Sequence, residues 1–269
     1  MTETKTHTRT GDIRAHERFR SRFLPVKRPL LVYVPPGYQA RGARRYPVLY
    51  MQDGQNLFDK ATSVGEEWGV DETAQSLIES GQIEPLIIVA IYNTGEQRID
   101  EYTPTKVEGK GGGSADLYGR MLVEELKPFI DRKYKTLPSA ASTGLAGSSL
   151  GAVLTLHLGV KYPTAFNRLA ALSPSVWWDN RTIVREYDAL AAKLPLRIWL
   201  DVGSEEGAEV LADVRALRDT LLNKGWVVDH DLRYTEAEGG AHNEQSWGAR
   251  MGEVLKFLFP AKKEGATRC

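Results

Sequence analysis

A serine held between glycines is the first feature of this sequence that could carry chemistry. Residues 147–151 read Gly-Ser-Ser-Leu-Gly, which fits the pattern G-x-S-x-G around Ser149. An apolar stretch of strand length precedes the pattern, and an apolar helical stretch follows it. In that context the serine lies on a sharp strand-to-helix turn, with its hydroxyl exposed as a nucleophile. The alternative is that small residues only fill the turn, because the bare pattern also occurs by chance.

A serine nucleophile needs a base, and the chain offers five histidines. His242 is the candidate, because it lies in a glycine-marked loop between the last expected strand and the last expected helix. The alternative for His242 is a structural place near the start of that helix, which Asn243 could cap. The other histidines lie in the polar N-terminal stretch, inside a helical pattern or inside a strand pattern: His7, His16, His157 and His230.

The third member of a triad is a carboxylate that follows a strand between the serine and the histidine in the chain. Residues 196–207 contain Asp201, Glu205 and Glu206. Asp201 is expected inside the strand, whereas the two glutamates lie on the loop after it, free to reach an imidazole. Glu206 is our candidate for the acid that orients the imidazole, with Asp201 and Glu205 left as alternatives. Both glutamates could instead simply begin the next helix, where acidic residues favour the dipole.

An acyl-transfer site also needs two backbone donors for the oxyanion. The amide after the nucleophile, that of Leu150, is one. The second comes from a loop after an early strand, and the amide of Gln55, after Asp53-Gly54, is the candidate.

Strands and helices that alternate along the chain would position these groups. Several strand-length stretches are apolar on both faces, as in a parallel sheet covered on each side by helices. The pattern predicts an α/β-hydrolase type of fold, a mostly parallel, doubly wound sheet with one or two antiparallel strands near the N-terminus. We expect strands within 28–36, 46–53, 85–93, 142–148, 167–175, 196–203 and 226–235, and helices within 115–134, 207–225 and 243–259.

Length and composition limit the classes of function. The 269 residues suit one large domain, which we place at 28–260, with an extension and possible edge strand at 1–27 and a tail at 261–269. Equal numbers of basic and acidic residues remove the electrostatic motive for binding nucleic acid or an anionic membrane. We therefore expect a small-molecule or saccharide ester as the partner, and the oligomeric state is not readable.

Targeting and cofactor signals are few. The N-terminal stretch lacks the apolar core of a secretory signal, so we expect a cytoplasmic protein, or a secreted one if a leader was removed. The single cysteine, Cys269, rules out a disulfide framework and leaves a free thiol on the tail. No metal or other cofactor is expected. The glycine-rich stretch 106–117 lacks a dinucleotide-binding spacing, and we expect a mobile loop there.

The sequence resembles the putative esterase family of α/β hydrolases, which includes feruloyl and acetyl xylan esterases, siderophore esterases, S-formylglutathione hydrolases and mycolyltransferases. The likeness runs from about Arg28 to Phe259. It is carried by RPLLVYVPPGY (28–38), YPVLYMQDGQNLFD (46–59), RIDEYTP (98–104), ELKPFID (125–131), GSSLGA (147–152), LSPSVWW (172–178), LDVGSEEG (200–207) and GGAHNEQSW (239–247).

The resemblance implies roles for individual residues. Ser149 matches the nucleophile, His242 the base and Gln55 the oxyanion donor, while a G-[ST]-x-[DE] arrangement places the acid at Glu206. Two positions depart from the pattern of many members, which have His-Gly where this chain has Asp53-Gly54 and Asp at the acid. Candidates for the substrate pocket are Asp53, Asn56, Arg98, Tyr102, Trp177 and Trp178. Arg98 and Tyr102 could equally form a salt-bridged structural corner with Glu101. The two tryptophans could instead pack in the hydrophobic core.

The leading hypothesis is a serine carboxylester hydrolase that acts through an acyl-enzyme on a small or carbohydrate-linked acyl ester. A bound alcohol could intercept the acyl group instead of water, which would make the protein an acyltransferase. A siderophore lactone is a further possible substrate. The fold could also serve as a non-catalytic ligand-binding domain, which a missing triad member would indicate.

Overall fold

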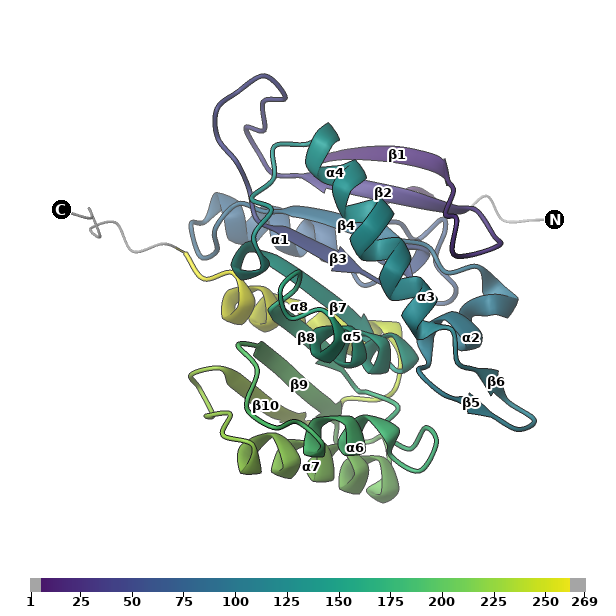
Figure 1. Cartoon of the computed structure of the whole chain (residues 1–269). Helices are drawn as coiled ribbons and strands as arrows, with labels where there is room; N and C mark the ends of the chain where they lie inside the picture. The colour runs from purple at the N-terminus through teal and green to yellow at the C-terminus, as the bar shows by residue number, and fades with distance from the viewer. Residues whose placement is uncertain (1–5, 262–269) are drawn as a thin grey trace.

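One eight-stranded sheet organises the protein in the computed structural model, which describes residues 6–261 (Figure 1). The strand order is β1-β2-β4-β3-β7-β8-β9-β10. β1 pairs antiparallel with β2, β2 pairs antiparallel with β4, and every other neighbouring pair is parallel. The strands are β1 (Asp12–Phe19), β2 (Arg28–Val34), β3 (Val48–Met51), β4 (Ile87–Ile91), β7 (Thr143–Ser148), β8 (Arg168–Leu172), β9 (Arg197–Gly203) and β10 (Leu232–Ala237).

Helices cover both faces of the sheet (Figure 1). One apolar core packs against α1 (Val70–Glu79) and α8 (Glu244–Leu258). The larger core lies on the opposite face, under α3 (Ala115–Arg120), α4 (Lys127–Lys133), α5 (Leu150–Lys161), α6 (Thr182–Asp188) and α7 (Ala208–Asn223). Central strands such as β4 are buried along their whole length, which explains why they read as continuous apolar runs. The predicted doubly wound, mostly parallel sheet is therefore confirmed.

The last predicted strand is wrong in its first half. β10 begins at Leu232, and the preceding residues form a turn in which Asp229 has a φ of 61°. The Asp231 carboxylate holds this turn by accepting a hydrogen bond from the Val227 amide at 2.7 Å. Trp226 is buried against Tyr187 instead of lying in the sheet. The buried Trp226 and the exposed Val227 and Val228 thus imitate a strand, and His230 also lies exposed in that turn.

The glycine-rich stretch forms a short hairpin, β5 (Lys106–Val107) and β6 (Gly111–Gly112), next to α2 (Arg98–Tyr102). Gly112 has a φ of +100°, and its amide donates a 2.5 Å hydrogen bond to the Asp100 carboxylate. The sequence predicts a mobile loop here; the structure places a hairpin of two-residue strands within it, because these glycines take the positive-φ conformations that the hairpin requires.

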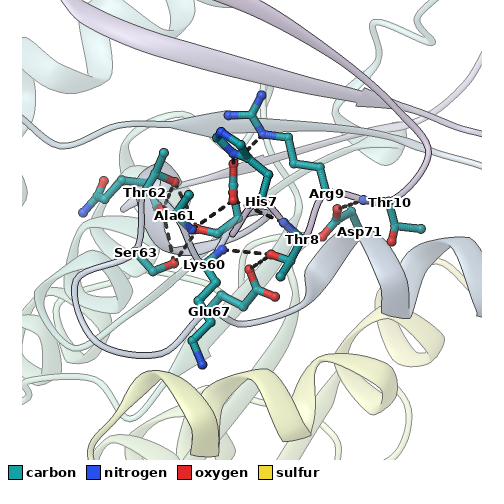
Figure 2. A network of polar contacts seen from close by, with 12 residues as sticks. His7, Thr8, Arg9, Thr10, Lys60, Ala61, Thr62, Ser63, Glu67 and Asp71 are labelled. Carbon is teal, nitrogen blue, oxygen red and sulfur yellow. Dashed lines mark hydrogen bonds and ion pairs between the residues drawn. The ribbon is translucent and has the colours of Figure 1, made fainter. Parts of the chain in front are cut away.

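The N-terminal segment is fastened to the domain (Figure 2). The buried Asp59 carboxylate binds His7 Nδ1 at 2.7 Å and Arg9 Nε at 2.8 Å. Thr8 Oγ1 donates to Glu67 and accepts from the Lys60 amide. The segment then enters β1, the edge strand of the sheet. We call residues 7–10 the N-terminal strap. Cys269 lies outside the described residues, and within them no helix is long and apolar enough to cross a membrane.

Candidate active site

The carboxyl ends of the parallel strands meet at one edge of the sheet, and the predicted site residues follow them. Ser149 comes directly after β7 and before α5, with φ 56° and ψ −122°. A non-glycine residue at positive φ stores strain that the surrounding structure must hold. Hydrogen bonds from the Ser149 amide to Leu172 and from the Ser175 amide to Ser149 fix this turn, at 3.0 and 3.1 Å.

The glycine two residues before Ser149 has a steric reason. A Cβ on Gly147 would lie 2.5 Å from Gln52 Oε1 and 2.7 Å from the carbonyl carbon of Gly151. Both distances are far below van der Waals contact, and one involves backbone that cannot move aside. The turn thus admits only glycine at position 147, which explains the first glycine of the sequence pattern.

Ser149, His242 and Glu206 form one chain of hydrogen bonds although they are far apart in sequence. His242 Nε2 lies 3.0 Å from Ser149 Oγ, and His242 Nδ1 lies 2.7 Å from Glu206 Oε2. The imidazole packs edge-on against Trp247, with ring centroids 4.9 Å apart. Ser175 Oγ also lies 3.0 Å from Ser149 Oγ. The candidate nucleophile and the candidate acid therefore each lie within hydrogen-bond reach of the candidate base.

Glu206 is well suited to remain ionised. Its side chain is 1% exposed, and Oε1 accepts hydrogen bonds from the Gly203 amide at 2.7 Å and from Ser173 Oγ at 2.5 Å. Burial alone would raise the pKa of this carboxyl, but His242, Ser173 and the Gly203 amide together hold it below its usual value. An ionised Glu206 can only accept, so a neutral His242 must carry its proton on Nδ1 and present a bare Nε2 to the serine.

Ser173 supplies a second, unpredicted contact to the acid. Its hydroxyl oxygen receives Trp247 Nε1 at 3.0 Å and Arg250 Nη2 at 2.9 Å. Indole and guanidinium N–H groups can only donate, so they occupy both acceptor positions of the hydroxyl. The single hydroxyl proton must therefore point at Glu206. This arrangement fixes the direction of the Ser173 proton and the tautomer of a neutral His242.

The two alternative acids have other roles. Asp201 is fully buried at the end of β9, where it accepts hydrogen bonds from Trp199 Nε1 at 2.7 Å, Arg250 Nε at 3.0 Å and the Ser173 amide at 3.1 Å. It thereby holds Arg250 and Ser173 in place. Burial raises the pKa of Asp201, and the Arg250 charge opposes that rise. Glu205 is exposed and does not contact His242.

The two oxyanion candidates lie at helix starts. Leu150 is the first residue of α5, and Gln55 lies in a short 3₁₀ helix, Gly54–Asn56. Amides in a first helical turn have no acceptor within the helix and are free to bind an anion. The Gln55 carbonyl accepts a 2.7 Å hydrogen bond from Thr62 Oγ1. That bond links the Gln55 loop to residues 59–63, to which the N-terminal strap is fastened.

Asp53 is held firmly beside Gln55. It has a φ of 55°, and its carboxylate binds Arg98 through two hydrogen bonds of 2.8 and 2.7 Å. Asn93 Nδ2 donates a third, and the Asp53 amide donates to the Tyr102 hydroxyl at 3.2 Å. Glu101, by contrast, forms a buried ion pair with Arg28. The RIDEYTP segment is thus both a salt-bridged corner and a wall of the site.

A cleft of about 320 Å³ opens beside Ser149 and His242. Of the predicted pocket residues, Asp53, Asn56 and Arg98 line it. Tyr102 is fully buried below Asp53. The structure does not bring the tryptophans into this cleft: Trp178 is 2% exposed and bonds Thr105, while Trp177 is 45% exposed beneath Lys110. Strand-end position alone does not tell whether a side chain turns inward or outward.

Other cleft residues were not predicted. They are contributed by the segment after the 3₁₀ helix, the loop after β4 and the first turn of α8, namely Val64, Trp68, Asn93, Glu244 and Trp247. Trp247 and Glu244 belong to the GGAHNEQSW segment. Their closeness to His242 in the chain was the available signal. The sequence holds no such signal for Val64 and Trp68, because the loop that carries them reaches the cleft only through tertiary packing.

Comparison with known proteins agrees with this architecture. The model of the family described as "Putative esterase" matches residues 21–258. The endo-1,4-beta-xylanase/feruloyl esterase of Xylanibacter ruminicola is 26% identical over 232 residues, which cover 85% of this chain and 29% of that protein. The ferri-bacillibactin esterase BesA of Bacillus subtilis is 28% identical over 182 residues, 60% of each chain.

A solved structure is similar in fold. The crystal structure of the BES protein from Bacillus cereus superimposes with a TM-score of 0.75 at 22% identity and covers 96% of this chain and 99% of that one. The family match spans most of the sequence, and the neighbour has the same α/β-hydrolase arrangement. The chain therefore belongs to the Putative esterase family, and it is a carboxylic ester hydrolase of the α/β-hydrolase fold.

Proposed function

We propose that this protein is a serine esterase in which Ser149 is the nucleophile, His242 the base and Glu206 the orienting acid. The observation that carries the proposal is the continuous hydrogen-bond chain from Glu206 through His242 to Ser149, at 2.7 and 3.0 Å. The order serine, acid, histidine along the chain is the order of α/β-hydrolase triads. The strained backbone of Ser149 adds support, since it presents the hydroxyl to the cleft.

The geometry supports the following reaction. His242 Nε2 takes the hydroxyl proton as Ser149 Oγ attacks the ester carbonyl carbon, and the negative charge moves to the carbonyl oxygen. The amides of Leu150 and Gln55 stabilise that oxyanion. The imidazolium, stabilised by Glu206, gives its proton to the leaving alcohol, and an acyl-Ser149 ester remains. His242 then takes a proton from water as the water oxygen attacks the acyl carbon, and the imidazolium returns that proton to Ser149 Oγ as the bond to the serine breaks and the acid is released.

The substrate is proposed to be a small or carbohydrate-linked acyl ester. A cleft of about 320 Å³ accommodates a small acyl group and part of its alcohol. One relative is named a feruloyl esterase, which supports an ester of an aromatic acid, and another is named a ferri-bacillibactin esterase, which supports a siderophore ester. Acyl transfer would use the same groups, with a bound alcohol in place of water.

Hydrolysis of p-nitrophenyl acetate, butyrate and octanoate tests the proposal. Ser149→Ala is expected to lower kcat by about 10⁴-fold or more, because it removes the hydroxyl that forms the proposed acyl-enzyme. Ser148→Ala is the matched control in the same motif, since Ser148 lines the cleft without joining the triad. An active wild type with an equally active Ser149→Ala variant would contradict the assignment. Added alcohols that yield new esters would identify a transferase.

A further inference from the structure

The charge of the cleft bears on which esters can enter it. The ionisable lining residues outside the triad are Asp53, Arg98 and Glu244. The only cation, Arg98, is bound by both oxygens of Asp53. With one positive and two negative charges, the lining carries a net charge of about −1, and Glu206 adds a further negative charge behind the imidazole.

Glu244 is the uncompensated charge. It is the first residue of α8, and its Oε1 accepts one hydrogen bond from Asn56 Nδ2 at 3.2 Å. No cation forms an ion pair with it among the described residues. Glu244 nevertheless acts electrostatically on Arg98. Burial lowers the pKa of Arg98, but the negative charges of Asp53 and, to a smaller extent, of Glu244 hold that pKa above its usual value. The dipole of α8 offsets only part of this charge.

We propose that the cleft selects esters without negative charge and that Glu244 is a specificity-determining residue. The proposal rests on the proposed serine esterase function. A substrate that bears a carboxylate or sulfonate near the ester, or an anionic metal complex, meets net negative charge in a partly enclosed cleft. An alcohol part that carries hydroxyl or ammonium donors instead finds the carboxylate of Glu244 as an acceptor. Both kinds of donor can form a hydrogen bond to this carboxylate, and only the ammonium also brings a positive charge.

Three acetate esters of similar size separate these cases: 3,3-dimethylbutyl acetate is neutral, acetylcholine is cationic, and the acetate ester of 2-hydroxyethanesulfonate is anionic. We expect kcat/KM, measured by acetate release, to be roughly 3- to 30-fold lower for the anionic ester than for the neutral one at low salt. Raising the salt from about 20 mM to about 500 mM should shrink that ratio. If acetylcholine exceeds the neutral ester, the cleft also prefers a positive charge; if the two are equal, it only excludes negative charge.

Glu244→Gln removes the negative charge but keeps the size of the side chain and its contact to Asn56. It should therefore raise the ratio of kcat/KM for the anionic ester to kcat/KM for the neutral ester by roughly fivefold. Glu253→Gln on the same helix is the matched control, since Glu253 is exposed and outside the cleft. A role of Glu244 limited to the start of α8 would change all three esters equally and leave the ratio fixed, which overturns the proposal. An anionic ester that is hydrolysed as fast as the neutral one also overturns it while the esterase function stands. If none of the three esters nor any p-nitrophenyl ester is hydrolysed, the proposed function itself fails.

Discussion

Replacement of Glu206 by glutamine tests the hydrogen-bond chain at the point where the structure is most restrictive. Oε1 of Glu206 accepts from the Gly203 amide and the Ser173 hydroxyl, and the Ser173 proton can point nowhere else. In Glu206→Gln, this position must therefore hold the carbonyl oxygen. The amide nitrogen then lies at the Oε2 position, 2.7 Å from His242 Nδ1. Because that nitrogen donates, Nδ1 must accept, and the ring proton moves to Nε2.

An imidazole with its proton on Nε2 cannot take a proton from Ser149. The productive orientation requires the amide to flip, which sets its N–H groups against the Gly203 amide and the Ser173 hydroxyl. Each unsatisfied donor costs about 1–3 kcal/mol, so the flip costs about 2–6 kcal/mol. At about 1.4 kcal/mol per factor of ten, the active fraction falls to between about 1 in 30 and 1 in 10⁴. We expect kcat for p-nitrophenyl acetate to fall within that range.

The assay compares initial rates of the wild type, Glu206→Gln and the control Glu205→Gln, whose exposed side chain does not contact His242. Removing the Ser173 hydroxyl in a Ser173→Ala/Glu206→Gln double variant removes one of the two constraints on the amide. That variant should be roughly tenfold faster than Glu206→Gln alone, by the same accounting. Glu206→Gln within about threefold of wild type, or a double variant slower than Glu206→Gln, would refute the reasoning.

Four further predictions follow from the structure. The folded state holds the pKa of Glu206 below its usual value of 4.5, so the ionised form stabilises the folded state above about pH 4.5. That contribution is lost as the pH falls through the folded pKa. The free energies of unfolding of wild type and Glu206→Gln, measured in urea, should therefore differ more at neutral than at acid pH. Gly147→Ala should lower the free energy of unfolding by about 1–3 kcal/mol, whereas the control Gly252→Ala, whose Cβ meets Thr73 only at 3.8 Å, should not destabilise α8. Deletion of residues 1–10 removes His7, Thr8 and Arg9, leaves the buried Asp59 carboxylate without these partners, and should lower the Tm as well as kcat. Asp59→Asn in the shortened chain removes the buried charge and should recover part of the Tm. A deletion without effect on kcat would show that the strap does not support the Gln55 loop. Arg98→Ala leaves Asn93 as the side-chain partner of the Asp53 carboxylate and should reduce kcat/KM at least tenfold. Arg98→Lys should recover only part of it, because a single ammonium cannot replace both hydrogen bonds.

Local sequence was sufficient for the elements and for the outline of the site. Gly147, Ser149 and Gly151 identify the strand-to-helix turn because the backbone there excludes a Cβ at position 147. The apolar runs identify the buried parallel strands. Residues 226–231 are a false strand in the sequence, because the buried Trp226 and the exposed Val227 and Val228 together imitate one. The positions after the strands also place Ser149, Glu206 and His242 at one edge, since the carboxyl ends of parallel strands coincide.

Tertiary structure decided which of these groups touch and what surrounds them. Asp201 lies within β9, and Glu205 and Glu206 follow that strand. Only the folded chain turns Glu206 towards His242 and sets Arg250 against Asp201. Three features bring together residues that lie tens of positions apart: the hydrogen bond from Ser173 to Glu206, the place of Trp68 in the cleft lining, and the ion pairs of the N-terminal strap with Asp59. A single sequence holds no periodic or local signal for contacts of this kind. The sequence by itself determined the fold class and the chemistry available at the strand ends, because backbone sterics and apolar periodicity are local. The direction of each side chain, and hence the shape and charge of the cleft, depends on packing between distant segments, which only the folded chain brings together.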